Sequence, residues 1–199
     1  MGNSGTMWRR RHNVHHAMPQ RIGRDIDLDN LPVLLINIKL MDDPNHANHL
    51  FYRYQGSGGN LCNSNLLFVC ILNWVLALGK FTNCIAISYL FFNFGLSHTH
   101  LPVTDKPTHW VEHGLVHTAD VDQRPWCDWW MGYLNYQIEH HLFPTMPQFR
   151  NKLAVNRVRA FAKNHGVPYH VHSHKEAVMR MMYNIWDVTQ QVKRFPLNS

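Results

Sequence analysis

Hydrophobic residues gather in one segment of the chain, residues 61–96, which is the only stretch apolar enough for a membrane. This segment divides at Gly79 and Lys80 into two halves, each at the short end of the ~20 residues that a helical span needs. The pattern predicts a thin or tilted transmembrane hairpin. A single span followed by an interfacial stretch is the alternative.

Helices are expected on both sides of this segment. Residues 7–18 are predicted to form a helix that Pro19 ends, and the apolar run 31–41 is too short to cross a bilayer, which favours a buried or interfacial helix. After the segment, a loop is expected over 120–126 and a helix over 127–143. The periodicity therefore predicts a chain built mainly of helices.

Two further helices are expected near the C-terminus. Pro147 suits the first position of one helix and Gly166 the position just past its end. Ser173 and Glu176 form a capping box for a last helix that reaches about Val192. The first of these helices has an apolar face made of Phe149, Leu153, Val158 and Phe161.

Length and composition limit the fold class. The 199 residues suffice for one domain, and a mean hydropathy of −0.31 restricts any embedded part to a minority of the chain. We therefore expect an all-α, membrane-embedded fold over residues 1–199, with a transmembrane hairpin at 61–96 and a cytosolic helical region at 127–193.

Charge and cysteine usage indicate the orientation. The formal charge is +6, and no nucleic-acid motif accompanies it, so the positive-inside rule explains the basic start better than a nucleic-acid partner does. None of the four cysteines forms a C-x-x-C pair, which favours a reducing, cytosol-facing location. The basic residues near the start are Arg9, Arg10, Arg11, Arg21 and Arg24.

Histidine is unusually abundant, with 16 residues against 13 acidic ones, and it recurs in patterned clusters. Two clusters place metal-capable side chains at positions i, i+3 and i+4, which share one face of a helix. The first cluster is His12, His15 and His16, and the second is Gln137, His140 and His141. Enrichment of surface histidine is the simpler alternative, but the repeated spacing favours metal binding.

The clusters together offer more ligands than one tetrahedral zinc ion takes. Five histidines and a glutamine exceed the four ligands of a structural zinc site, so two metal ions are expected. If the clusters share one site, they lie on the same side of the membrane. The chain between them then crosses an even number of times, which agrees with a hairpin.

Other histidines are assigned by their spacing. His46 and His49 have no third partner nearby, so we expect them at a surface or interface. His170, His172 and His174 alternate and cannot share a helical face, which predicts surface positions. Glu139 is expected to orient a neighbouring histidine, because its direction differs from that of Gln137 and His140.

Three segments resemble the C-terminal half of a membrane fatty acid desaturase of the front-end (delta-5/delta-6) type. They are RHNVHHA at 11–17, SHTHLPV at 97–103 and WWMGYLNYQIEHHLFPTMP at 129–147. Glutamine in place of histidine at the first position of the last box, here Gln137, is the mark of the front-end enzymes.

The resemblance implies a centre of two iron ions that activates dioxygen and places a cis double bond in a polyunsaturated fatty acyl chain. Cytochrome b5 is the implied electron donor, an acyl-CoA or phospholipid the implied substrate, and the endoplasmic reticulum membrane the implied location, with the histidine boxes facing the cytosol. His100 competes with His98 for one ligand position. The implied ligands are His12, His15, His16, His98, Gln137, His140 and His141.

Two parts of the family pattern have no match in this sequence. They are the first histidine box, of the H-D-x-x-H type, and the cytochrome b5 haem domain that is often fused at the N-terminus. A fragment or truncated form is therefore expected, with at least one iron short of ligands. The alternatives are a non-catalytic desaturase-like membrane protein, and a histidine-box lipid hydroxylase or sphingolipid desaturase. Trp129, Trp130 and Tyr136 are expected either to line an acyl channel or to lie in an interfacial aromatic belt.

Overall fold

The computed structural model describes residues 5–25, 28, 35–40, 55, 89–90, 92–106 and 108–195. Most of the expected membrane segment, as well as His46 and His49, lies outside these residues. Among the described helices, none combines the length and the apolar character that a bilayer crossing requires.

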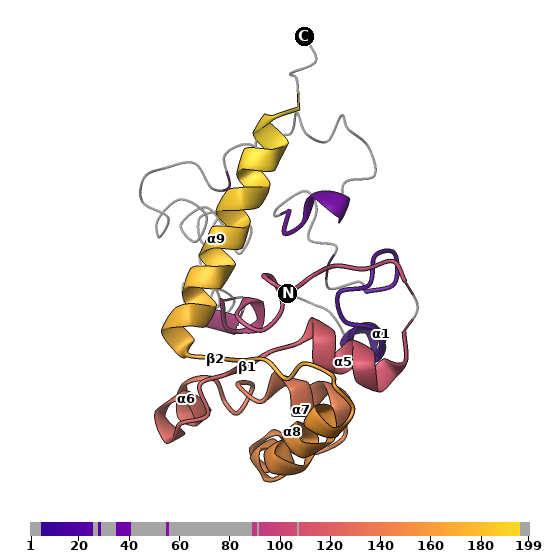
Figure 1. Cartoon of the computed structure of the whole chain (residues 1–199), viewed down its shortest axis with the longest axis vertical. Helices are drawn as coiled ribbons and strands as arrows, with labels where there is room; N and C mark the ends of the chain where they lie inside the picture. The colour runs from indigo at the N-terminus through magenta and orange to yellow at the C-terminus, as the bar shows by residue number, and fades with distance from the viewer. Residues whose placement is uncertain are drawn as a thin grey trace.

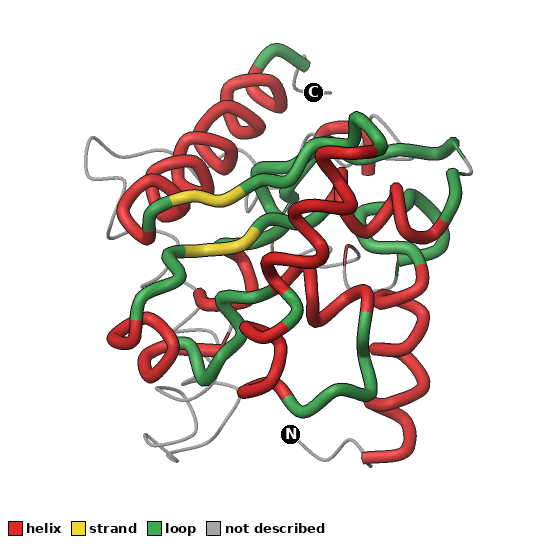
Figure 2. Tube along the Cα trace, turned by 60° about the horizontal axis from the view of Figure 1, so that its bottom comes forward, coloured by secondary structure: helices red, strands yellow, loops and turns green. Residues whose placement is uncertain are grey.

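The described part is mainly helical, as expected, and contains one pair of short strands (Figures 1 and 2). The strands run parallel, with Asp120 opposite Val171 and Val121 opposite His172. This pairing was not predicted, because two-residue strands leave no alternating pattern in the sequence. The elements are α1 (Gly5–Ala17), η2 (Ile38–Leu40), α5 (Trp110–His117), β1 (Asp120–Val121), α6 (Pro125–Trp130), α7 (Gln137–Leu142), η4 (Gln148–Leu153), α8 (Val155–Asn164), β2 (Val171–His172) and α9 (His174–Lys193).

The prediction of one continuous helix over 127–143 is wrong, because the helix is interrupted between α6 and α7. Gly132 and Tyr133 both adopt the left-handed region, with φ of 57° and 64°, which a right-handed helix cannot include. Buried Asn135 stabilises the turn, since its amide donates to the backbone oxygen of Asp122 at 3.2 Å. The last histidine cluster therefore starts a short helix of its own.

The helix after Pro147 also differs from the prediction. Its first part is the 3-10 helix η4, which has about 3.0 residues per turn rather than 3.6, so the apolar spacing expected across both parts fails. Phe149, Leu153 and Phe161 are 53, 72 and 43% exposed, and of the expected face only Val158 is buried. The buried residues of α8 are Val155, Val158 and Ala162.

Helix α9 begins as predicted at Ser173, whose Oγ accepts the backbone N–H of Glu176 at 3.2 Å. His172, just before it, is buried rather than on the surface. In Figure 1, α9 is the long yellow helix that rises from the strand pair. It contributes Ala177, Met181 and Ile185 to a core whose other buried members include Leu96, Val103, Val121, Cys127 and Met131.

A second core holds α7 in place. Ile138 and Leu142 of α7 pack with Leu115 of α5 and with Val158 and Ala162 of α8. On an ideal helix, Ile138 and Leu142 point away from the direction shared by Gln137, His140 and His141. Burial of the apolar side of α7 therefore turns its polar side toward α1.

Candidate metal centre

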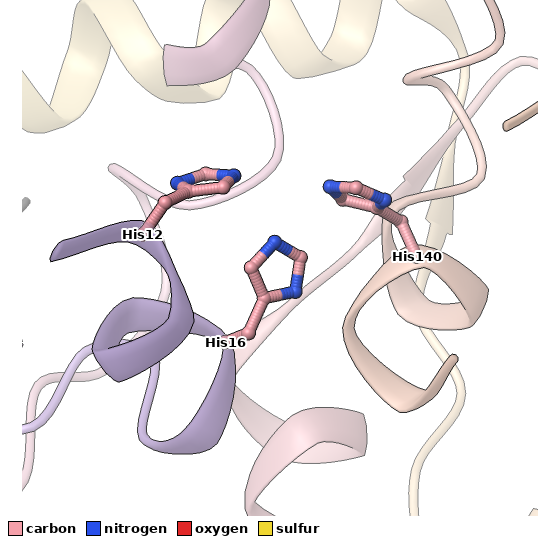
Figure 3. A group of neighbouring side chains, drawn as sticks. All are labelled: His12, His16 and His140. Carbon is pink, nitrogen blue, oxygen red and sulfur yellow. The ribbon is translucent and has the colours of Figure 1, made fainter. Parts of the chain in front are cut away.

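The two histidine clusters meet between α1 and α7. In the described part of the chain, six histidines form two groups of three, and within each group one ring nitrogen per residue lies within 4.8 Å of the others. The first group is His12, His16 and His140, and Figure 3 shows the first two reaching from α1 toward the third on α7. The second group is His15, His98 and His141.

Distances in the second group agree with a metal site. Nε2 of His98 and Nε2 of His141 are 3.2 Å apart. Two nitrogens that each lie ~2.0–2.1 Å from one ion are separated by about 3 Å, so this spacing fits a shared ion. The residues present therefore fit a metal without rearrangement of these two rings.

Gln137 lies beside the second group. Its amide nitrogen is 3.1 Å from Nε2 of His98 and 3.5 Å from Nε2 of His141. A half-turn of the amide exchanges its nitrogen and oxygen, and the oxygen is the atom able to bind a cation. The seven implied ligands, from His12 to His141, thus lie at this one location, whereas the rival His100 does not.

The two groups are neighbours that share both helices. His16 and His141 belong to different groups, yet their rings stack with centroids 4.5 Å apart. His140 and His141 are adjacent in sequence and serve different groups, because consecutive residues of a helix point about 100° apart. The arrangement therefore forms two adjacent groups, each of which could hold a metal ion.

The structure distinguishes the two candidates His98 and His100. His98 belongs to the second group. His100 belongs to neither group, and its ring lies 5.1 Å from the ring of His172. Neither ring nitrogen of His100 has a hydrogen-bond partner among the described residues. Geometry therefore favours His98.

Burial keeps several of these imidazoles neutral. It lowers the pKa of His98 and His141 well below 6.5, and the charges of neighbouring histidines lower both further. Burial likewise lowers the pKa of His140 to about 4, with His12 and His15 adding to the effect. Neutral imidazole is the form that binds metal ions, so the site needs little deprotonation before it can accept one.

Asp25 is a functional candidate that the sequence reasoning missed. Nδ1 of His15 lies 2.9 Å from both carboxylate oxygens of Asp25, which also accepts the backbone N–H of Gln20 at 2.7 Å. Carboxylates commonly orient metal-binding histidines in this way. The only sequence signal was the acidic loop after Pro19, which does not single out Asp25 from Asp27 or Asp29.

Two histidines of α5 tie the surrounding segments together. Nε2 of His113 donates to the backbone oxygen of Pro19 at 2.6 Å, just past α1. Nδ1 of His117 donates to the backbone oxygen of Pro102 at 2.7 Å, just past the segment that carries His98. These contacts place α5 as a support for both sides of the site.

Glu139 does not orient a histidine of the clusters, contrary to expectation. It is fully buried and faces away from them, with Oε1 lying 2.9 Å from the hydroxyl of Tyr169. Burial raises the pKa of Glu139, and nearby Asp120 raises it further.

Of the aromatic residues considered for an acyl channel, Trp129 is 80% exposed and Tyr136 is buried.

Comparison with known proteins places this geometry in context. The family described as fatty acid desaturase matches residues 60–173. The chain is 33% identical to an acyl-lipid (8-3)-desaturase of Rebecca salina, over 94% of this chain and 53% of the relative. It is also 33% identical to an acyl-lipid (8-3)-desaturase of a Thraustochytrium species, over 96% of this chain and 53% of the relative.

A Delta(5) fatty acid desaturase of Caenorhabditis elegans is 26% identical, over 85% of this chain and 49% of its own length. No solved structure matches the chain. The chain thus spans about half the length of the curated relatives that it matches. With a family match over more than half of its residues and front-end relatives along almost all of it, this chain belongs to the fatty acid desaturase family.

Proposed function

We propose that the protein takes part in the oxygen-dependent desaturation of polyunsaturated fatty acyl chains at a centre of two iron ions. The observation that supports this most directly is the pair of three-histidine groups between α1 and α7. Family membership supplies the reaction class, and the histidine groups supply a place for the metal.

Each histidine group would hold one ion. His12, His16 and His140 would hold the first, while His15, His98 and His141, with the amide oxygen of Gln137, would hold the second. When bound, the iron pair supplies the oxidising chemistry with dioxygen that removes two hydrogens from the acyl chain. Three or four protein ligands leave open positions on each ion, as catalytic metal sites require.

The reaction defines its other participants. Removal of two hydrogens while dioxygen becomes two waters consumes two further electrons and two protons, so an electron donor is needed. Cytochrome b5 is our proposed donor, and a membrane of the endoplasmic reticulum our proposed location. Both relatives at 33% identity are named acyl-lipid desaturases, which favours an acyl chain attached to a lipid as the substrate.

The proposal is tested by expression in yeast that is fed polyunsaturated fatty acids. Because the chain spans about half of its relatives, two forms are compared: the chain alone, and a chimera that carries the N-terminal half of the Rebecca salina relative. We expect a new double bond from the chimera, and its loss in the His140→Ala variant. His100→Ala is the matched control, which should keep the product.

Iron content gives a second measurement on purified protein. Two irons per chimera support the proposal, whereas absence of iron together with absence of a product would leave a non-catalytic desaturase-like protein. A hydroxylated product in place of a double bond would assign the same centre to a lipid hydroxylase.

A further inference from the structure

Helix α7 carries three candidate ligands but is too short to be stable by itself. It spans six residues, and isolated helices below ~12 residues are marginal in water. Within the described structure, Tyr136 at its N-cap makes no side-chain capping hydrogen bond. Some other part of the chain must therefore fix where α7 begins and how it is rotated.

Asp120 caps α7 from outside the helix. Its Oδ1 accepts the backbone N–H of Ile138, the second residue of α7, at 3.0 Å, although the two residues are 18 positions apart. A carboxylate at this position satisfies an unpaired N–H and interacts favourably with the helix dipole. Asp120 is itself fixed, because its backbone N–H donates to the backbone oxygen of His170 at 2.9 Å.

Tyr169 connects the cap to the middle of α7. Its hydroxyl donates to Oδ2 of Asp120 at 2.7 Å and lies 2.9 Å from Oε1 of Glu139. Gln123 adds a further contact, with its amide donating to Oδ2 of Asp120 at 2.8 Å. Asp120 and Glu139 are both fully buried, so solvent does not replace these contacts.

The anchored side of α7 is opposite the side that carries the candidate ligands. On an ideal helix, Ile138 and Glu139 point 100° and 200° on from Gln137, while His140 and His141 lie within about 60° on either side of it. A shift or rotation of α7 would therefore move all three candidate ligands together.

We propose that Asp120 and Tyr169 are positioning residues, which fix α7 and thereby set the geometry of the metal centre without touching metal or substrate. This inference rests on the proposed function, since it assigns a role to residues that act through Gln137, His140 and His141. It predicts that the removal of either contact changes the metal site itself.

The test uses cobalt(II) as a probe, because its visible absorption reports ligand geometry. The wild-type chain, Asp120→Ala and Tyr169→Phe are titrated with cobalt(II), and thermal unfolding is followed in parallel. We expect shifted cobalt bands and at least about tenfold weaker binding in both variants. Asp120→Asn retains an acceptor for the N–H of Ile138 and should restore part of the wild-type affinity.

Val188→Ala is the matched control, because it removes buried methyl groups from the separate core along α9. It should lower the unfolding temperature and leave the cobalt bands unchanged. The inference is overturned if Tyr169→Phe has the cobalt bands and the cobalt affinity of the wild type. It is also overturned if Val188→Ala shifts the cobalt bands as much as Tyr169→Phe does. Wild-type protein that takes up no cobalt would instead overturn the metal centre, and the inference with it.

Discussion

Both carboxylate oxygens of Asp25 lie 2.9 Å from Nδ1 of His15, and the two side chains are buried together. This contact favours the tautomer in which Nδ1 carries the hydrogen and donates it to Asp25. Nε2 is then the nitrogen of His15 whose lone pair is available to a metal ion in the second histidine group. The carboxylate thus determines which nitrogen of His15 can bind a metal ion.

Asp25→Ala should weaken metal binding about 10- to 100-fold, the usual loss when the partner of a ligating histidine is removed. The measurement is competition with a chelator of known iron affinity. Asp105→Ala removes an exposed carboxylate and serves as the control, with no loss expected. Equal affinities for the Asp25 and Asp105 variants would exclude the proposed role of Asp25.

His98→Ala should remove the metal of the second group and leave that of the first, because His12, His16 and His140 remain intact. His100→Ala should retain both metals. Iron per protein, determined by mass spectrometry of the purified variants, distinguishes these outcomes. A larger loss in His100→Ala than in His98→Ala would reverse the assignment.

Stability should decrease as the pH falls below about 6.5, in part through His113. Burial and neighbouring His117 lower the pKa of His113 from its ordinary value of 6.5, so the folded state favours the neutral ring. Its Nδ1 then accepts from Thr108 at 2.9 Å while Nε2 donates to Pro19. Below pH 6.5, the unfolded chain binds a proton at His113 more readily than the folded chain does. The contribution of neutral His113 to stability is therefore complete only above that pH.

The measurement is the difference in unfolding temperature between pH 7.5 and pH 5.0. His113→Gln should show a smaller difference than the wild type, whereas His165→Gln, at an exposed position, should show the wild-type difference. An unchanged difference in His113→Gln would exclude this contribution.

Ser173→Ala should destabilise the protein by about 1 kcal/mol, because the backbone N–H of Glu176 loses its acceptor. Ser173→Asp retains a capping oxygen and should remain close to the wild type. Chemical denaturation of the three proteins provides the comparison. The cap accounts for the whole effect, since Glu176 turns its own carboxylate to Arg180 and His172.

Local spacing predicted which histidines of α1 and of α7 lie together. Positions i, i+3 and i+4 on α1 and α7 lie where helical periodicity places them, and His98 joins them as the family pattern implied. The choice between His98 and His100 required the structure, because both lie in the same short segment.

The contacts that position the site could not be predicted, because they join residues that are distant in sequence. Asp120 caps a helix that starts 17 residues later, and no periodic pattern reports such a contact. The break before α7 was missed for a related reason, since Tyr133 adopts a left-handed backbone that its residue type rarely favours. Buried contacts of the turn, including Asn135, stabilise that conformation.

Each helix of the metal centre contributes one pair of consecutive residues, and each pair is divided between the two histidine groups. The pairs are His15 with His16 on α1 and His140 with His141 on α7. Consecutive Cα atoms are held about 3.8 Å apart by covalent bonds, so the distance between the two ions would be limited by two peptide links rather than by packing. A sliding of α1 along α7 would disturb both ions together, whereas the two ions could not drift apart while these four histidines hold them.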